Sequence, residues 1–284
     1  MTDVIDCSLA ALHLYPIKSC AGIAVDEGLL IETGLQFDRA WMVVDEQGGM
    51  LTQREHPRLA LVRPTMRADD LVLRAPGMLA LHVSLDGVEG PTRARVWGDE
   101  VKAFDMGALA AQWFSDFLGL RARLVRFDPE QQRLSDRRWT GDLTAENAFS
   151  DGFPLLVAST ASLAELNRRL LAAGHAAVTM ERFRPNLVLD GLEAHDEDRI
   201  GEIEFGGSDG PVRLRLVKPC TRCSIPDVDP ASAETGLAVG DTLRGYRADT
   251  RVGGAATFGM NAVIVEGIDR VLSPGMAGRA RWSF

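Results

Sequence analysis

Short apolar runs separated by turn residues are the feature that most constrains the fold of this chain. Through the first third of the sequence they return roughly every 8–12 residues, with turns such as Thr33-Gly34 between them. This spacing is typical of an antiparallel barrel or sandwich, because each strand is short and reverses at a turn. We expect strands at 8–16, 25–31, 40–44, 59–62, 71–73, 79–85 and 121–127.

Two segments show helical spacing within what is otherwise a mostly β (α+β) pattern. Apolar residues recur with a helical period over 107–118, and Gly119 is placed to end that helix. Ser162 and Glu165 have the spacing of a capping box for a second helix over 163–173. Around these helices we expect a long polar loop at 128–147 and strands at 153–158, 186–190, 201–205, 212–217 and 261–266.

The composition is that of a globular protein with an acidic net charge. Of 284 residues, 46% are hydrophobic and 25% are charged, and the net charge is −9. Neither a nucleic acid nor an anionic membrane is therefore expected as a partner. No apolar run reaches the roughly 18 residues that a membrane-spanning helix needs, and residues 1–7 lack the basic start of a secretory signal. Four cysteines in so long a chain do not make a disulfide framework, so a reducing, cytoplasmic location is the expectation.

Two of the four cysteines, Cys220 and Cys223, lie close together after a predicted strand. Residues 212–217 alternate in character as a half-buried strand does, and Pro219 is expected to end this strand because proline cannot donate to a strand ladder. The pair would then lie in a loop, with Arg222 beside it. A neighbouring cation favours the thiolate, which is the form of cysteine that binds metals.

The spacing of this pair alone leaves three other interpretations open. The first is a pair of small buried side chains, since free cysteine is often buried. The second is a zinc site, which needs two more ligands, but neither Cys7 with Cys20 nor the five histidines form a second spaced pair. The third is a redox pair, although such pairs prefer a helix N-terminus and prolines flank this one.

Two other segments carry side chains suited to an anion. Lys18 and Ser19 place an ammonium, a hydroxyl and backbone N–H groups in a turn, which together can hold a phosphate or an oxo group. Arg184 and Asn186 precede a later strand, and in an extended chain they face the same side. Arg39 is a third basic position. The alternative for each is a solvated side chain in a loop or at a strand entrance.

Seven segments, spread in order over almost the whole chain, match the pattern of one family. They are residues 15–20, 34–41, 52–59, 150–155, 162–167, 183–188, and 220–223 with 228–230. Together they resemble the MOSC family with its N-terminal β-barrel partner domain, in the branch that includes the mitochondrial amidoxime reducing component and its bacterial homologues. Seven segments in register make a chance match implausible.

The resemblance implies an N-terminal MOSC β-barrel domain over 1–120, packed against a C-terminal MOSC β-barrel domain with a few helices over 121–284. It also implies a pyranopterin molybdenum cofactor (Mo-molybdopterin) bound by the second domain, with contributions from residues near 18–41. Cys223 matches the catalytic metal ligand, and Cys220 matches a position that is not a ligand. The positions that match cofactor contacts are Lys18, Ser19, Arg39, Asp151, Arg184, Asn186, Thr221, Arg222 and Asn261, where the mitochondrial relatives carry tyrosine at the last.

The activity implied by the resemblance is the reduction of N-hydroxylated compounds, such as amidoximes and hydroxylamino purines, by oxygen-atom transfer to molybdenum. A soft thiolate ligand suits such a centre, and the cofactor performs the transfer. No cysteine follows Cys223, so we expect electrons to come from a separate donor protein of the flavin, ferredoxin or cytochrome type. The alternatives are a molybdenum-cofactor carrier or sulfur-handling MOSC module, in which a cysteine would carry persulfide, and a catalytically silent pterin-binding scaffold.

Overall fold

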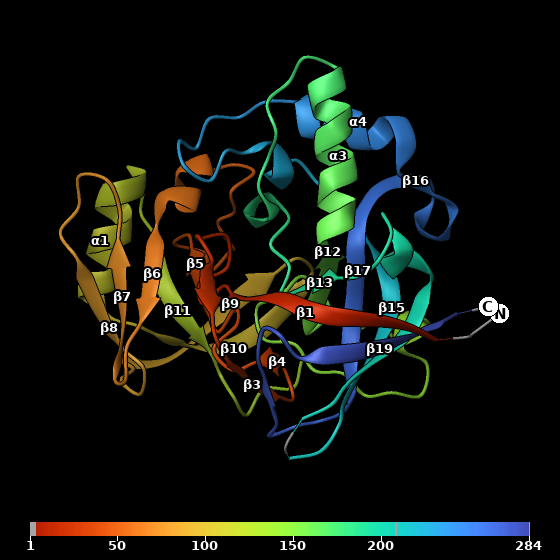
Figure 1. Cartoon of the computed structure of the whole chain (residues 1–284). Helices are drawn as coiled ribbons and strands as arrows, with labels where there is room; N and C mark the ends of the chain where they lie inside the picture. Colours follow the sequence, from red (N-terminus) through yellow and green to blue (C-terminus); the bar gives the residue numbers. More distant parts are fainter. Residues whose placement is uncertain (1–3, 208, 284) are drawn as a thin grey trace.

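The computed structural model describes residues 4–207 and 209–283. Its largest feature is a closed β-barrel, in which seven strands of the described chain form a ring (Figure 1). In ring order these strands are β12 (Leu155–Ser159), β13 (Leu187–Asp190), β1 (Val4–Leu14), β19 (Ala277–Trp282), β14 (Ile200–Phe205), β15 (Val212–Thr221) and β17 (Ala255–Glu266). β12 runs parallel to β13, and the other neighbouring pairs of the ring are antiparallel.

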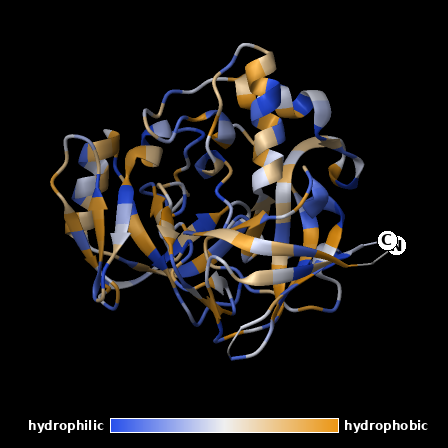
Figure 2. Ribbon diagram, viewed as in Figure 1, coloured by the Kyte–Doolittle hydropathy of each residue, from blue (hydrophilic) through white to orange (hydrophobic). Residues whose placement is uncertain are grey.

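The alternation along β15 explains why the ring closes around an apolar core. Val212, Leu214 and Leu216 are buried, while Arg215 between them pairs with Glu202 of β14 outside the core. Burial of each such side chain contributes about 1.5–3 kcal/mol to the free energy of unfolding. Figure 2 shows hydrophobic and hydrophilic residues mixed along the barrel strands, as this alternation requires.

The remaining sheets come mostly from the first half of the chain and lie beside the barrel (Figure 1). The two larger groups of strands, with the helix that packs on them, are β5 (Trp41–Val44), β6 (Arg63–Met66), β7 (Asp70–Arg74), β8 (Leu81–Ser84), β9 (Gly90–Val96), β10 (Asp99–Asp105), α1 (Ala108–Leu118) and β11 (Arg123–Phe127), and β18 (Val271–Leu272), β3 (Gly28–Ile31) and β4 (Gly34–Leu35) form a third, small sheet. One antiparallel sheet has the order β5-β11-β10-β9, and β6-β7-β8 forms another. Helix α1 packs against β11 and β8, and buries Phe114 and Phe117 in the core between them.

Two helices pack against each other beside the barrel, α3 (Thr160–Ala172) and α4 (Ala238–Tyr246). Leu166 of α3 and Leu243 of α4 meet Phe183 and Phe258 in one buried cluster. Among the described residues, no helix is long and apolar enough to cross a membrane. The smaller elements are β2 (Ile23–Val25), β3 (Gly28–Ile31), β4 (Gly34–Leu35), α2 (Arg137–Thr140), β16 (Ala248–Asp249), β18 (Val271–Leu272) and the 3₁₀ turns η1 (Pro57–Leu61), η2 (Met180–Arg182), η3 (Asp196–Arg199), η4 (Ile225–Asp227) and η5 (Thr250–Val252).

The expected mostly β fold with a few helices is confirmed. The helix predicted to end at Gly119 is α1, and Gly119 takes a φ of 72°, a left-handed conformation that glycine adopts without strain. Pairing between strands crosses residue 120 in both directions, because β1 belongs to the barrel and β11 pairs with β5 and β10. The division of the chain at 120 and 121 stays a prediction.

Three local predictions are wrong. The segment 59–62 is not a strand, because Pro57 begins the 3₁₀ turn η1, which buries Leu59. Helix α3 is capped by Ser159 rather than Ser162, since the Ser159 hydroxyl accepts a hydrogen bond from the backbone N–H of Ser162 at 3.1 Å. The expected strand 25–31 is two short strands, β2 and β3, and the strands β6, β9, β10 and β19 and the helices α2 and α4 were not predicted.

Candidate functional site

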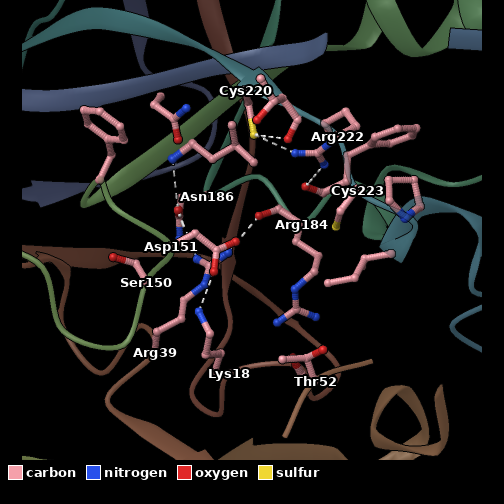
Figure 3. Close-up of a pocket in the computed structure, with 18 of the residues that line it drawn as sticks. Lys18, Arg39, Thr52, Ser150, Asp151, Arg184, Asn186, Cys220, Arg222 and Cys223 are labelled. Atoms are coloured by element: carbon pink, nitrogen blue, oxygen red, sulfur yellow. Dashed lines mark hydrogen bonds and ion pairs between the residues drawn. The ribbon is translucent and has the colours of Figure 1, made fainter. Parts of the chain in front are cut away.

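A cleft lies where loops from the first half of the chain meet the rim of the barrel. It encloses about 850 Å³, including the space open to solvent. Figure 3 shows Cys220 and Cys223 towards one end, Lys18 and Thr52 towards the other, and Arg184 between them. Every residue expected to contact a cofactor lines this cleft: Lys18, Ser19, Arg39, Asp151, Arg184, Asn186, Thr221, Arg222, Cys223 and Asn261.

Lys18 is held in a tight turn after β1. Its backbone N–H donates to the carbonyl of Trp41 at 2.8 Å, and the next residue, Ser19, takes a left-handed φ of 67°. The Lys18 side chain is buried, and its ammonium donates to the carbonyl of Phe149 at 2.7 Å and to the carboxylate of Asp151. Burial lowers the pKa of Lys18, and the Asp151 carboxylate acts against this shift. The lysine is therefore anchored, not solvated.

Two guanidinium groups lie over the buried ring of Tyr15, that of Arg39 at 4.4 Å and that of Arg184 at 4.3 Å from its centroid. Arg39 donates to the Asn186 side-chain oxygen at 3.1 Å and to the Arg184 carbonyl at 3.0 Å. Arg184 donates to the Cys20 carbonyl at 2.5 Å. Burial, and then the charge of Arg39, lower the pKa of Arg184 to about 10, so it is still a cation at neutral pH.

Asn186 supports the wall of the cleft. It is 1% exposed, and its side-chain oxygen also accepts from the backbone N–H of Leu156 at 3.1 Å, while its side-chain nitrogen donates to the His13 carbonyl at 3.3 Å. The expected extended segment from Arg184 is wrong, because Arg184 takes a left-handed φ of 58° and β13 begins only at Leu187. Both residues still reach the cleft, through a turn.

The cysteine pair lies at the end of β15, which does not stop at Pro219 as expected. β15 continues to Thr221, and its pairing with β17 shifts register on both sides of Pro219. Bulges of this kind accommodate proline within a sheet. Cys220 is half-buried, whereas Cys223, beyond the strand, is exposed. The interpretation of the pair as two buried side chains is therefore wrong for Cys223.

Arg222 is fixed between strand and loop. Its guanidinium donates to the Sγ of Cys220 at 2.8 Å and to the carbonyl of Phe183, and its backbone N–H donates to the Ala256 carbonyl at 2.9 Å. Its Nε is buried without a hydrogen-bond partner in the described chain. Asn261 on β17 donates from its side-chain nitrogen to the Lys218 carbonyl at 3.2 Å. The Nε of Arg222 is thus left unsatisfied within the described chain.

The protein alone does not assemble a metal site here. Within 4–207 and 209–283, no three or more histidine, cysteine, aspartate or glutamate side chains are grouped so as to hold a metal ion. Cys7 and Cys20 are buried in other parts of the core, and burial raises their pKa values to about 11 and about 12. The zinc interpretation therefore lacks its remaining ligands among the described residues.

Sequence reasoning missed several residues that line the cleft. Thr52 and Arg54 lie inside segment 52–59, which carries part of the family resemblance, so this resemblance is the signal that could have identified them. Trp97 lies between two polar strands, where no sequence pattern marks it. Other lining residues that were not predicted are Ser150, Phe153, Arg182, Phe183, Ile225 and Pro226.

Comparison with known proteins agrees with this architecture. The family model "MOSC N-terminal beta barrel domain" matches residues 7–121, and "MOSC domain" matches residues 144–276. The mouse (Mus musculus) mitochondrial amidoxime-reducing component 1 is 37% identical over 253 residues, which cover 84% of this chain and 71% of that protein. The human (Homo sapiens) mitochondrial amidoxime reducing component 2 is 36% identical over 84% of this chain and 72% of its own length.

A third relative carries a different name. The human (Homo sapiens) molybdenum cofactor sulfurase is 30% identical over 267 residues, which cover 88% of this chain but 29% of that protein. Both kinds of relative match the barrel and the N-terminal sheets together, since the matches span more than four fifths of the chain. The chain belongs to the MOSC family, with an N-terminal MOSC β-barrel domain followed by a MOSC domain.

Proposed function

We propose that this chain binds a molybdenum cofactor in the cleft and reduces N-hydroxylated compounds, with Cys223 as the thiolate ligand of the metal. The observation that carries the proposal is the exposed thiol of Cys223 in a cleft that also holds Lys18, Arg39 and Arg184. A soft thiolate suits such a metal centre, and cations suit the phosphate of the pterin. The relatives named as amidoxime-reducing components support the choice of reaction.

The donor set fits such a cofactor. Because the described residues group no three metal-binding side chains, the other metal donors would have to arrive with the cofactor. The buried, unpartnered Nε of Arg222 lies beside the cysteines and offers a hydrogen bond to a ligand there. Ser19 and Arg184 would hold the phosphate end, with Lys18, Asp151 and Asn186 fixing the loops that shape it.

The residues of the chain would act by binding, orientation and charge. When bound, the cofactor supplies the metal centre at which oxygen leaves the N–OH group. The cations Arg39 and Arg184 are already fixed over Tyr15, so they need little reorganisation to meet an anionic ligand. A separate electron-donor protein would return the centre to its reduced state. We place the reaction in the cytoplasm, with no nucleic acid or membrane as a partner.

The proposal is tested by comparing the two cysteines. The protein is produced in a host that makes the cofactor, bound molybdenum is measured by mass spectrometry, and benzamidoxime reduction is assayed with a chemical electron donor. We expect Cys223→Ala to lose the metal and Cys220→Ser to retain it. Full metal content in the Cys223 variant would refute the ligand assignment. A fully loaded protein that reduces no N–OH compound would refute the reductase activity.

A sulfur-handling or carrier role is the second candidate, favoured by the relative named as a molybdenum cofactor sulfurase. In that case one cysteine would carry persulfide, and Cys220, held by Arg222, would be placed to do so. The protein is treated with cysteine and a cysteine desulfurase, whose own persulfide passes its outer sulfur to the acceptor thiol, and mass spectrometry of the intact protein and of its peptides decides this. A gain of one sulfur atom on either cysteine, without reduction of N–OH compounds, would favour the second role.

A further inference from the structure

Trp97 lies at the tip of the hairpin that joins β9 and β10. Val96 pairs with Asp99, so Trp97 and Gly98 form a two-residue loop. Trp97 takes a φ of 56°, in the left-handed region where glycine is the favoured residue, and its side chain remains 49% exposed. The turn itself would be less strained with glycine at this position, so the tryptophan side chain at the mouth of the cleft points to a role outside the turn.

Contacts from three segments fix Trp97 against the cleft. The Arg54 guanidinium lies over its ring at 4.5 Å from the centroid, and the indole N–H donates to Asp151 at 3.3 Å. The strand residue that follows the loop, Asp99, is held by buried Arg133, which donates to it at 2.8 Å. Arg133 also donates to the Ser150 carbonyl at 2.8 Å, next to Asp151. The exposed part of the ring is therefore presented at a fixed position.

Arg54 has donors to spare. Its side chain is only 20% exposed, and its nearest charged partner is Glu55, at 3.6 Å from Nε to Oε1. Apart from this ion pair, the Arg54 guanidinium makes no hydrogen bond within the described chain, whereas Arg39 binds the Asp38 carboxylate and the Asn186 side-chain oxygen, and Arg184 binds the Cys20 carbonyl. Because a guanidinium binds carboxylate or phosphate with two parallel hydrogen bonds, Arg54 is suited to an anionic group that enters the cleft.

We propose that Trp97 and Arg54 form a substrate subsite at the mouth of the cleft, in which a planar conjugated ring stacks on Trp97 and an anionic substituent binds Arg54. The subsite would favour aromatic or heteroaromatic N-hydroxylated compounds that carry a carboxylate or phosphate over small aliphatic ones. This inference rests on the proposed function. Stacking on an indole tolerates any planar ring, so selectivity comes from planarity and charge.

The test compares three substrates, 4-carboxybenzamidoxime, benzamidoxime and acetamidoxime, in the cofactor-loaded protein. Trp97→Gly keeps a residue that suits the hairpin φ, and should raise KM for both aromatic substrates about tenfold, the loss expected for one stacking contact. The kcat values and the KM for acetamidoxime should change little, and Trp97→Phe should restore most of the affinity. Arg54→Gln should raise KM for the carboxylate substrate alone. Arg58→Gln is the matched control, because Arg58 lies over the Phe117 ring at 4.6 Å without lining the cleft.

Calorimetric titration of 4-carboxybenzamidoxime without an electron donor gives a second readout, since no turnover then occurs. Weaker binding by Trp97→Gly and Arg54→Gln, but not by Arg58→Gln, supports the subsite even if the protein reduces nothing. Equal Kd and KM in wild type and both variants would overturn the subsite while leaving the reductase proposal intact. Loss of molybdenum from Arg54→Gln would also overturn it, because Arg54 would then hold the cofactor.

Discussion

Arg222 donates a hydrogen bond to the Sγ of Cys220 at 2.8 Å, whereas Cys223, three residues after Cys220, is exposed. The two thiols of one short motif therefore have different surroundings. Cys220 lies in the last part of β15, against Arg222, while Cys223 lies beyond the strand, where an incoming group meets it directly. Cys220 is therefore held in place by a hydrogen bond, and Cys223 is the thiol that a ligand can reach.

We predict that iodoacetamide modifies the four cysteines of the cofactor-free protein at different rates. Cys223 should react first because it is exposed, and Cys220 more slowly because it is half-buried. Cys7 and Cys20 should stay unmodified until the protein unfolds, since burial raises their pKa values to about 11 and about 12. Peptide mapping by mass spectrometry over time measures the order. Equal rates at Cys220 and Cys223 would contradict it.

Asn186 should be a stability residue, although it lines the cleft. Asn186→Ala removes hydrogen bonds to Leu156, His13 and Arg39. Leaving buried polar groups unsatisfied costs about 1–3 kcal/mol each, so a loss of at least about 3 kcal/mol in the free energy of unfolding is expected. Urea unfolding monitored by circular dichroism measures this loss.

Asn261→Ala is the matched control for that experiment. Asn261 also lines the cleft, but the one hydrogen bond of its side chain goes to the Lys218 carbonyl at 3.2 Å. Its replacement should cost about 1 kcal/mol, the usual value for one net hydrogen bond. Similar losses for the two variants would show that the Asn186 network contributes no more than a single contact.

Much of the fold follows from local pattern, because the strongest signals are local ones. The helix α1 has a clear helical period and a glycine at its end, and both were readable from the sequence. The β9–β10 hairpin was not predicted, because its exposed face is polar and charged. Its turn also places Trp97 at a positive φ, where a sequence pattern predicts glycine or asparagine rather than tryptophan. Pro219 was wrongly predicted to end β15, because the register shifts in the pairing with β17 accommodate the proline, and this pairing is not visible in the local sequence.

The candidate site was predictable where its residues follow one another in short segments. Lys18 and Ser19, like Arg184 and Asn186, were found because each pair occupies one turn beside a strand. The partners of these residues were not predictable, because Lys18 bonds to Phe149 and Asp151, more than 130 positions away. The sequence therefore indicated which side chains line the cleft. Only the fold shows which of them already have hydrogen-bond partners within the protein.

Gly259 should be required for the approach of β17 to β12. It takes a φ of 75°, and a Cβ there would lie 2.6 Å from the backbone oxygen of Val157. Gly259→Ala must move a strand of the barrel near Asn261, so we expect a loss of at least about 3 kcal/mol, above the roughly 1 kcal/mol for a left-handed alanine. Gly253→Ala is the control, because Gly253 has a φ of 70° with open space around it. Equal melting temperatures for the two variants would contradict the steric argument.

His195 should make the protein less stable as the pH falls. Both ring nitrogens are buried without hydrogen-bond partners in the described chain, and the ring packs against Tyr246 at 5.5 Å and Phe258 at 6.2 Å between centroids. Burial, and then the charge of Arg247, lower the pKa of His195 to about 4, with Glu165 acting against the shift and Arg169 adding to it. Between pH 6.5 and 4 the unfolded chain therefore binds a proton that the folded chain does not.

The free energy of unfolding should thus fall by at most about 3 kcal/mol from this group as the pH drops through that window, and no further below it. His195→Asn removes the titrating ring and keeps a residue that tolerates the left-handed φ of 65° at this position. Urea unfolding of both proteins at pH 7, 5.5 and 4.5 gives the difference. Glu197, whose pKa burial raises, titrates in both proteins and cancels from it. The variant should lose less stability than the wild type on acidification, and parallel curves would show that His195 is protonated in the folded state without cost.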